Sequence, residues 1–562
     1  MAKISGARYI AETFRGYGLT HVFYVEAILR RALVEMETLG IKRIVTHSEK
    51  AAAYMADGYA RFRKKPGICM AQSVGAANLA AGLQDAYLAR SPVIAITGRK
   101  PSIAQYRNAY QEINHFSMFL PVTKYNAFVD TPEQLPYLLP QAFRETTSGT
   151  PGPVHLDMLG YEGDSICIGE VDQHVIIEKS FSQLPARRPE PETHFIQEAL
   201  TLISKSERSV IVAGAGIKTS GAEPLLIELA ELLSIPVATS LDGKGIISDE
   251  HPLNIGVVGT YSNGQANKVV EEADLVIFIG TNTGDQVTNI WTLPKLGTKV
   301  IQIDISCSEL GRNYPGTIGI LGDAKASLSK LLKYSKHRKN LKWIRQVQKV
   351  VQEGYQELLP LLNSDSVPIL PERLCKEISV SLPSDTVLVS DTGYAAIWTA
   401  NAIKLNGLDQ KYFRAAGSLG WAFPASLGIK CAALERPVIC FTGDGGFLYH
   451  ISELETAKRW NINTVTIINN NSMFAQALVG INRSYGKKTG RKEDMYKFID
   501  VDYAKIADDF GCFGIRVTKP EEIRDALQTA LKADKPSIVD VVTDGYHAAP
   551  WTKPTGPIVK LN

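Results

Sequence analysis

The stretch "TGDGGFLYHI" (residues 442–451) is followed by "IINNNSMFAQ" (residues 467–476), and these two stretches decide the fold. Each continues from an apolar run, "RPVICF" and "TVTII", of the kind that forms a buried parallel strand. The helix-like segment "ISELETAKRW" separates them. Such a unit predicts two parallel strands whose carboxyl ends meet at one sheet edge, where ligands of α/β proteins bind.

Phosphate and metal chemistry is predicted at these strand ends. The glycines around Asp444 let the backbone approach a phosphate closely. Asn471 lies 27 residues after Asp444, one strand–helix–strand unit away. A carboxylate, an amide oxygen and one backbone carbonyl would leave room around Mg²⁺ for phosphate oxygens and water. Taken separately, the two stretches are better explained as a tight turn and a helix cap, but their spacing favours the metal site.

The pair of stretches resembles the signature of thiamine-diphosphate-dependent enzymes, which is Gly-Asp-Gly followed after about two dozen residues by Asn-Asn. "VTHSEKAAAYMADGYAR" (residues 45–61) looks like the segment of that family that carries the cofactor-activating glutamate, and Glu49 matches it. "SDTGYAAIW" (390–398) is similar to a second diphosphate-binding loop. "YFRAAGSLGWAFPASLGIKCA" (412–432) is similar to benzoylformate decarboxylase, with Leu419 where the family supports a bent cofactor.

The resemblance implies a set of site residues. The implied metal ligands are Asp444, Asn471 and the carbonyl of Met473. The implied cofactor-binding residues are Glu49, Gly393, Tyr394, Gly417, Leu419, Gly443, Asp444, Gly445, Asn471 and Met473. The candidate catalytic residues are Glu49, Gln72, Gln111 and Gln476. Gln111, in "AYQEINHFSMFLPVTKYN", matches an active-site glutamine of acetolactate synthase, and Gln72 stands where benzoylformate decarboxylase has a histidine.

Strand-like and helix-like runs alternate along most of the chain, which predicts an α/β fold with three doubly wound parallel-sheet domains. The resemblance names them a thiamine pyrimidine-binding domain (1–182), a central Rossmann-like domain (190–335) and a diphosphate- and Mg-binding domain (366–546), with a C-terminal tail (547–562). The Pro-rich stretch "SQLPARRPEPETH" (182–194) marks the first boundary.

Composition excludes several other classes of protein. The net charge is +3 without a long basic run, so we expect no nucleic-acid partner. The seven cysteines are scattered, which predicts free thiols rather than disulfides or a zinc site. The chain has neither a signal-peptide core at its start nor an apolar stretch of membrane-spanning length, so we expect no membrane association and a cytoplasmic protein.

The substrate pocket departs from the known members of the family. The lysine that acetolactate synthase has after "GPVHLDML" is Gly160, and its downstream tryptophan falls near Gly480. Its flavin-contacting motif is replaced by "GTNTGDQVTN" (280–289). The family's Pro-Gly-Ser loop near the substrate is "VEAIL" (25–29), with Glu26 in place of the proline. These departures predict an unusual substrate pocket beside an ordinary cofactor pocket.

The sequence does not determine whether the central domain binds a ligand. "VIVAGAGIKTSG" places a Gly-x-Gly turn after a strand, but the glycine spacing is not that of a dinucleotide fingerprint. A structural domain without ligand and a domain that holds ADP or FAD both fit, with Asp304 and Asp323 as candidate nucleotide contacts. A nicotinamide-dependent dehydrogenase is disfavoured because the full fingerprint is absent.

The resemblance implies a Mg²⁺-dependent lyase, decarboxylase or carboligase acting on a 2-oxo acid, like acetolactate synthase or benzoylformate decarboxylase. The alternative is an enzyme that cleaves an acyl-CoA thioester, like 2-hydroxyacyl-CoA lyase or oxalyl-CoA decarboxylase. Basic side chains after the metal motif support it as a phosphate-binding lid: Arg483, Lys487, Lys488, Arg491 and Lys492. A solvated loop is the simpler explanation. The family also implies a homodimer or homotetramer, with Glu49 of one subunit serving the cofactor held by Asp444 and Asn471 of another.

Overall fold

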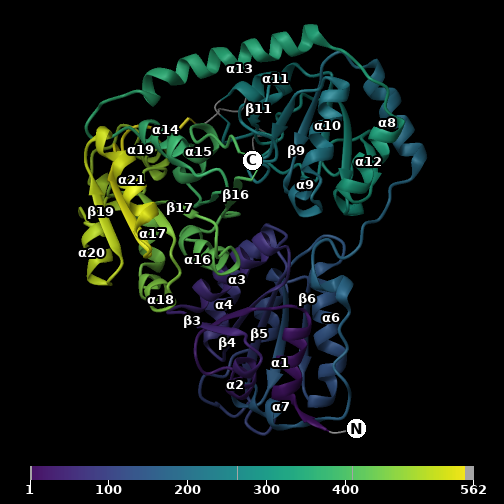
Figure 1. Ribbon diagram of the computed structural model, residues 1–562, viewed down its shortest axis with the longest axis vertical. Helices are drawn as coiled ribbons and strands as arrows, with labels where there is room; N and C mark the ends of the chain where they lie inside the picture. The colour runs from purple at the N-terminus through teal and green to yellow at the C-terminus, as the bar shows by residue number, and fades with distance from the viewer. Residues whose placement is uncertain (1–2, 263, 408, 551–562) are drawn as a thin grey trace.

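The computed structural model describes residues 3–262, 264–407 and 409–550, so residues 551–562 of the predicted tail lie outside it. Three α/β domains are arranged around a central opening in projection (Figure 1), the N-terminal domain in purple and blue, the central domain in teal and the C-terminal domain in green and yellow. Each contains one six-stranded sheet in which all neighbouring strands are parallel. The predicted fold class is confirmed, and the exact domain limits stay predictions.

The N-terminal sheet has the strand order β3-β2-β4-β5-β7-β6. Its strands are β2 (His21–Tyr24), β3 (Lys42–Val45), β4 (Gly67–Gln72), β5 (Val93–Arg99), β6 (Tyr125–Val129) and β7 (Val154–Leu159). Its helices are α1 (Gly6–Gly16), α2 (Arg30–Thr38), α3 (Glu49–Arg63), α4 (Gly75–Leu88), α5 (His115–Phe119), α6 (Leu135–Thr147) and α7 (Asp164–Ile168). A short antiparallel pair, β1 (Ile4–Ser5) with β8 (Glu170–Val171), joins the two ends of the domain.

The C-terminal sheet repeats that topology with the order β16-β15-β17-β18-β20-β19. Its strands are β15 (Val387–Ser390), β16 (Lys411–Arg414), β17 (Val438–Gly443), β18 (Val465–Asn470), β19 (Phe513–Val517) and β20 (Ser537–Val542). Its helices are α14 (Pro371–Ser381), α15 (Tyr394–Asn401), α16 (Ala422–Ala432), α17 (Asp444–Phe447), α18 (Glu453–Arg459), α19 (Ala477–Tyr485), α20 (Tyr503–Asp509) and α21 (Ile523–Lys532).

The central sheet has the order β11-β10-β9-β12-β13-β14, which is the 3-2-1-4-5-6 order of the Rossmann fold. Its strands are β9 (Ser209–Ala213), β10 (Val237–Thr239), β11 (Asn254–Val257), β12 (Leu275–Ile279), β13 (Lys299–Asp304) and β14 (Ile318–Leu321). Its helices are α8 (Thr193–Lys205), α9 (Ala215–Ser220), α10 (Glu223–Leu233), α11 (Gln265–Glu272) and α12 (Ala324–Tyr334). The long helix α13 (Leu341–Leu362) then runs to the C-terminal domain along the top of Figure 1.

Small residues bring the N-terminal and C-terminal domains into close contact through α3 and α16. A Cβ atom added to Gly58 would lie 2.2 Å from the carbonyl oxygen of Ala425, and one added to Gly428 would lie 2.0 Å from that of Met55. The run "AAAYMADGYA" is buried throughout. Its small side chains therefore let two helix backbones approach each other, which sets the distance between the domains.

No helix within the described residues is long and apolar enough to cross a membrane.

Candidate active site

The implied metal ligands lie where the C-terminal sheet changes the direction of its strand order. Strand β15 pairs with β16 on one side and with β17 on the other, so the crevice above β15 and β17 is a topological switch point. Gly393 follows β15, and Asp444 follows β17. Asn471 follows β18, which pairs with β17 in register. The structure therefore brings together the two strand ends that the sequence predicted to be neighbours.

Three buried side-chain oxygens at these strand ends have no hydrogen-bond partner among the described residues: Oδ2 of Asp444, Oδ1 of Asn469 and Oδ1 of Asn471. The first and the last belong to the implied metal ligands. Asp444 is 2% exposed, and burial raises the pKa of its carboxyl group to about 7. Buried oxygens without partners are costly, whereas a cation ligated by Asp444 and Asn471 would compensate their two oxygens. The residues present thus fit a Mg²⁺ ion, with the carbonyl of the buried Met473 as a third donor.

That donor set differs from an all-protein metal cage. No group of three or more His, Cys, Asp or Glu side chains that could hold a metal occurs in the described part of the chain. A cation here would need further oxygens from phosphate and water, as Mg²⁺ at phosphate sites usually does. Gly443 and Gly417 face open space, since no atom lies within 4 Å of a Cβ added to either. The site therefore leaves room for a phosphate-bearing group.

The other predicted residues of the C-terminal domain surround the same edge. Gly393 has a φ of 73° that favours glycine, and a Cβ added there would lie 3.0 Å from Oε1 of Gln476. Tyr394 begins α15 directly after Gly393. Gly445 is required by packing, because an added Cβ would lie 2.5 Å from the ring of Phe474.

The loop 415–421, which carries Leu419, is held by the N-terminal domain of the same chain. The Asp85 carboxylate in α4 is 0% exposed and accepts a charge-assisted hydrogen bond of 2.9 Å from Arg61. It also accepts three consecutive backbone N–H groups at 2.9–3.2 Å, those of Ala416, Gly417 and Ser418. A buried carboxylate with this many donors fixes the backbone just before Leu419.

The far end of the same loop is held as well. Asp57 pairs with Arg61 and accepts a 2.8 Å hydrogen bond from Nε1 of Trp421. The buried Asp391, at the end of β15, accepts the N–H of Gly420. We call Arg61, Asp57 and Asp85 the interdomain clamp. Asp57 and Arg61 lie in the stretch 45–61 quoted for Glu49, but the resemblance gave them no role, and Asp85 lies outside every quoted motif.

The predicted catalytic residues of the N-terminal domain form a second group, at the carboxyl ends of its strands. Glu49 begins α3, and its Oε2 accepts a 3.1 Å hydrogen bond from Asn78. A Cβ added to Gly75 would lie 2.4 Å from Oε1 of Glu49, so the carboxyl group occupies the space that this glycine leaves. Gln72 ends β4, and its Nε2 donates a 3.1 Å hydrogen bond to Oε1 of Gln111.

Within one chain, no described hydrogen bond or ion pair joins the Glu49 carboxyl group to Asp444 or Asn471. The start of α3 instead contacts the helices after the metal motif. The backbone N–H of His47 donates a 3.0 Å hydrogen bond to Glu453, and the rings of Tyr54 and His450 meet edge to face at 5.6 Å. The two groups of site residues are therefore built on separate domains.

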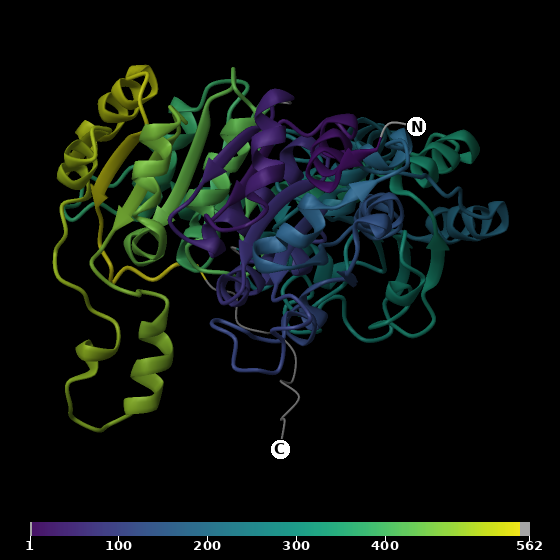
Figure 2. The same cartoon turned by 90° about the horizontal axis from the view of Figure 1, so that it is seen from below.

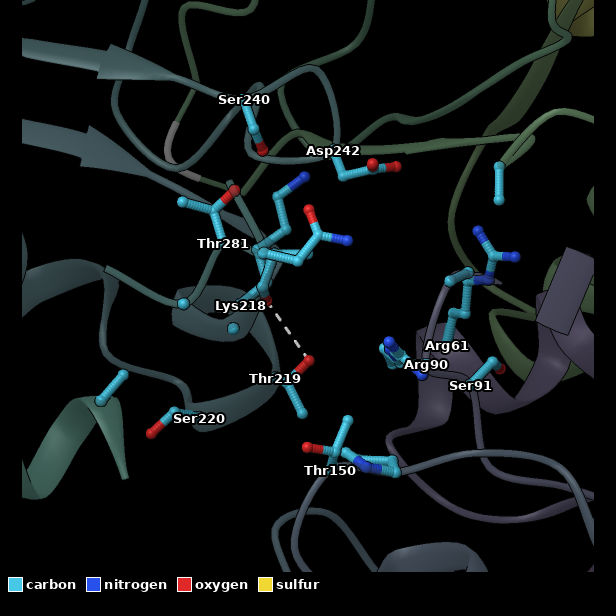
Figure 3. A pocket seen from close by; sticks show the side chains of 18 of the residues that line it. Arg61, Arg90, Ser91, Thr150, Lys218, Thr219, Ser220, Ser240, Asp242 and Thr281 are labelled. Carbon is cyan, nitrogen blue, oxygen red and sulfur yellow. Dashed lines mark hydrogen bonds between the residues drawn. The ribbon is translucent and has the colours of Figure 1, made fainter. Parts of the chain in front are cut away.

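A large cavity of about 1200 Å³ lies between the three domains (Figure 3). Ser240, Asp242, Thr281 and Lys218 line it from the central domain and face Arg61 and Arg90 of the N-terminal domain. Burial lowers the pKa of Lys218 to about 7, and its Nζ donates to the carbonyl of Tyr412. The candidate nucleotide contacts Asp304 and Asp323 also line the cavity, although Asp323 pairs with Arg188.

The predicted basic loop forms a projecting arm. Helix α19 and the residues that follow it, through the short helix Lys492–Met495, extend away from the body of the molecule in Figure 2. Part of its charge is neutralised internally, because Arg491 pairs with Asp494 and Lys497 pairs with Glu493. Within the described residues, Arg483, Lys487 and Lys488 form no ion pair. The arm thus presents net positive charge at its tip.

The fold and the site together define a cofactor-dependent α/β enzyme. Three family models match the chain: thiamine pyrophosphate enzyme, N-terminal TPP binding domain (4–118), central domain (196–331) and C-terminal TPP binding domain (391–541). The chain belongs to the thiamine pyrophosphate (thiamine diphosphate) enzyme family, which confirms the predicted resemblance.

Similar proteins include a probable acetolactate synthase large subunit of Methanocaldococcus jannaschii, 34% identical over 532 residues, which are 92% of this chain and 88% of that protein. An acetolactate synthase of Arthrospira platensis is 30% identical over 577 residues, covering 98% and 96% of the two chains. An acetolactate synthase large subunit of Lactococcus lactis is 28% identical over 557 residues, covering 97% and 94%. The chain is thus a thiamine-diphosphate-dependent enzyme of the carboligase type.

Proposed function

We propose that this protein is a Mg²⁺-dependent carboligase that joins two 2-oxo acid units with loss of CO₂. The observation that carries the proposal is the pair of buried oxygens without partners, Asp444 Oδ2 and Asn471 Oδ1, at adjacent strand ends beside open glycines. A Mg²⁺–diphosphate unit would satisfy both oxygens. The similarity to acetolactate synthases supports a 2-oxo acid as the substrate class.

Each group of site residues takes one task in this proposal. Thiamine diphosphate supplies, when bound, a nucleophilic carbon and an electron sink. Asp444, Asn471 and the Met473 carbonyl hold the cation and with it the diphosphate. Leu419, in the loop fixed by the interdomain clamp, would support the bound cofactor. Glu49 would share a proton with the pyrimidine ring of the cofactor.

Gln72 and Gln111 are proposed to orient the substrate. Their mutual hydrogen bond fixes one amide against the other and leaves the Gln72 oxygen and the Gln111 nitrogen for a ligand. A donor and an acceptor side by side suit a substrate that carries both a carbonyl and a hydroxyl group during the reaction. Gln476 lies beside Gly393, at the sheet edge that carries the metal ligands, and would contact the cofactor there.

The test is turnover of a simple 2-oxo acid such as pyruvate by protein stripped of cofactor and metal. We expect CO₂ release and a ligated hydroxy-oxo acid only when thiamine diphosphate and Mg²⁺ are both restored. Supply of either alone is the matched control. Undiminished turnover after exhaustive chelation and dialysis would contradict the metal assignment, and absence of a ligated product from any 2-oxo acid would contradict the carboligase.

An acyl-CoA thioester remains the second candidate substrate, and the projecting arm is the observation that favours it. Arg483, Lys487 and Lys488 lie on an extended element where CoA phosphates would gain from positive charge. The internal pairs of Arg491 and Lys497 weaken that case. Release of free CoA from a 2-hydroxyacyl-CoA, with none of the ligated product described above, would favour this candidate.

A nucleotide is proposed as the occupant of the central cavity. Its volume of about 1200 Å³ exceeds that of an ordinary small-ligand pocket. It lies at the edge of a sheet with Rossmann strand order, and its lining combines basic side chains such as Arg90 with the carboxylates of Asp242 and Asp285. Release of ADP or of a flavin on denaturing the purified protein supports this proposal. A cavity that takes up neither ligand on titration would mean a structural central domain.

We further propose that the active site forms between two subunits, as a homodimer or a dimer of dimers. The two groups of site residues are built on separate domains, and the described contacts of one chain leave Glu49 without a bond to the metal site. Glu49→Gln and Asp444→Ala, each inactive alone, then test this arrangement after mixing and reassembly. Random exchange in a dimer restores about a quarter of the sites. A mixture that stays inactive despite exchange would place both residues in a site of one chain.

A further inference from the structure

We propose that Lys100 binds the carboxylate of the acceptor substrate and thereby selects a 2-oxo acid over a neutral acceptor. This inference rests on the carboligase proposed above and assigns a specificity-determining residue to it.

Lys100 lies at the same sheet edge as the two glutamines. Strand β5 ends at Arg99, so Lys100 is the first residue beyond it. In the parallel register Gln72 pairs with Gly98, two residues before Lys100. Side chains at alternate positions of a strand point to the same face, so Lys100 continues the face on which Gln72 lies.

Lys100 is a buried residue whose ammonium group has no counter-ion within the described residues. The residue is 8% exposed, and its Nζ lies 5.1 Å from the centroid of the Tyr161 ring. Among the described residues, no carboxylate forms an ion pair with it. A ring face compensates only part of the hydration that a buried ammonium loses. A ligand carboxylate would supply the rest.

Two arginines at this edge already have acidic partners. Arg30 pairs with both Glu26 and Glu162. Arg99 pairs with Asp130, and its Nε lies 3.6 Å from a carboxylate oxygen of Asp157. Within the described residues, Lys100 forms no ion pair; Lys50, next to Glu49, forms none either, and its Nζ lies over the rings of Tyr54 and Tyr449.

The position beside Lys100 offers no competing cation. The register of β5 and β7 ends with Arg99 opposite Leu159, so Lys100 and Gly160 are the next residues beyond the paired part of the two strands. Glycine has no side chain, and its φ of 100° disfavours replacement by another residue. A single ammonium therefore meets a ligand that approaches between these strand ends.

The chemistry decides which carboxylate suits this lysine. The donor 2-oxo acid loses its carboxylate as CO₂, so an ion pair to that group would stabilise the charge that must leave. The acceptor keeps its carboxylate: the new carbon–carbon bond forms at its carbonyl carbon, and its carbonyl oxygen takes up a proton. An ion pair between Lys100 and the acceptor therefore persists from binding to product.

The experiment is a competition between two acceptors for one donor. Holoenzyme is supplied with pyruvate together with equal concentrations of 2-oxobutanoate and the neutral propanal, and the ratio of the two mixed products is measured. This ratio does not depend on the amount of correctly folded enzyme. We expect Lys100→Met to lower the ratio of acid to aldehyde product by roughly 10- to 100-fold, the value of a charged hydrogen bond. Lys100→Arg should keep most of it.

The control is Lys349→Met, on α13, where the lysine side chain is 77% exposed and far along the chain from the site. It should leave the product ratio unchanged. An active Lys100→Met enzyme with the ratio of the unaltered protein overturns the assignment of Lys100, whereas an unaltered enzyme that forms no ligated product overturns the carboligase. In that second case calorimetric binding of 2-oxobutanoate still decides, since affinity equal in both proteins would exclude Lys100 as its partner.

Discussion

Replacing Asp85 by alanine should both destabilise the protein and weaken its hold on the cofactor. The Asp85 carboxylate is fully buried and accepts hydrogen bonds from Arg61 and from three backbone N–H groups of the loop 415–421. Removal leaves the buried guanidinium with only Asp57 as an acidic partner and leaves the three N–H groups unpaired. Breaking a buried ion pair costs about 3–5 kcal/mol. For domains of this size that corresponds to a fall of roughly 6–20 °C in the unfolding temperature.

Differential scanning calorimetry of the protein with and without thiamine diphosphate and Mg²⁺ measures both effects. Stabilisation by the cofactor should shrink in Asp85→Ala, because Leu419 follows the released backbone and no longer supports the bound molecule. Asp85→Asn, which keeps the shape and one acceptor, should fall between the two proteins. Glu12→Ala, which removes a partly exposed pair with Arg8, is the control and should cost under about 1 kcal/mol. An Asp85→Ala protein that unfolds and binds cofactor like the unaltered protein would refute the clamp.

Two further changes separate the metal site from the projecting arm. Asp444→Ala should weaken retention of Mg²⁺ and thiamine diphosphate by at least 10-fold, because the one anionic metal ligand is lost, and equilibrium dialysis would show retention unchanged if the assignment were wrong. Lys487→Ala combined with Arg491→Ala should raise KM for an acyl-CoA thioester more than it lowers kcat, and should leave a small 2-oxo acid unaffected. Equal effects on both substrate classes would make the arm a solvated surface element.

The parts of the site that depend on local sequence could be predicted. An apolar strand, a glycine turn and a second apolar strand placed Asp444 and Asn471 at adjacent strand ends, and β17 and β18 are neighbours in the sheet. Local pattern suffices in this case because parallel βαβ units have a nearly fixed geometry.

Contacts between distant residues could not be predicted in the same way. Asp85 bonds to a loop that lies 331 residues further along the chain, and a single aspartate in an apolar helix carries no signal of that partner. The ammonium group of Lys100 lies over the ring of Tyr161 because β5 pairs with β7, and Tyr161 follows β7. Strand order and domain packing decide both features, and neither follows from periodicity.

Exchange of the C2 hydrogen of bound thiamine diphosphate for deuterium tests the central claim most directly. Glu49, at the start of α3 with its carboxyl group in the space left by Gly75, is the residue proposed to exchange a proton with N1′. Glu49→Gln should bind the cofactor but slow the exchange by about 10²- to 10⁴-fold, the usual contribution of a positioned acid–base group. A Glu49→Gln protein that exchanges C2 hydrogen at the rate of the unaltered enzyme would contradict the account.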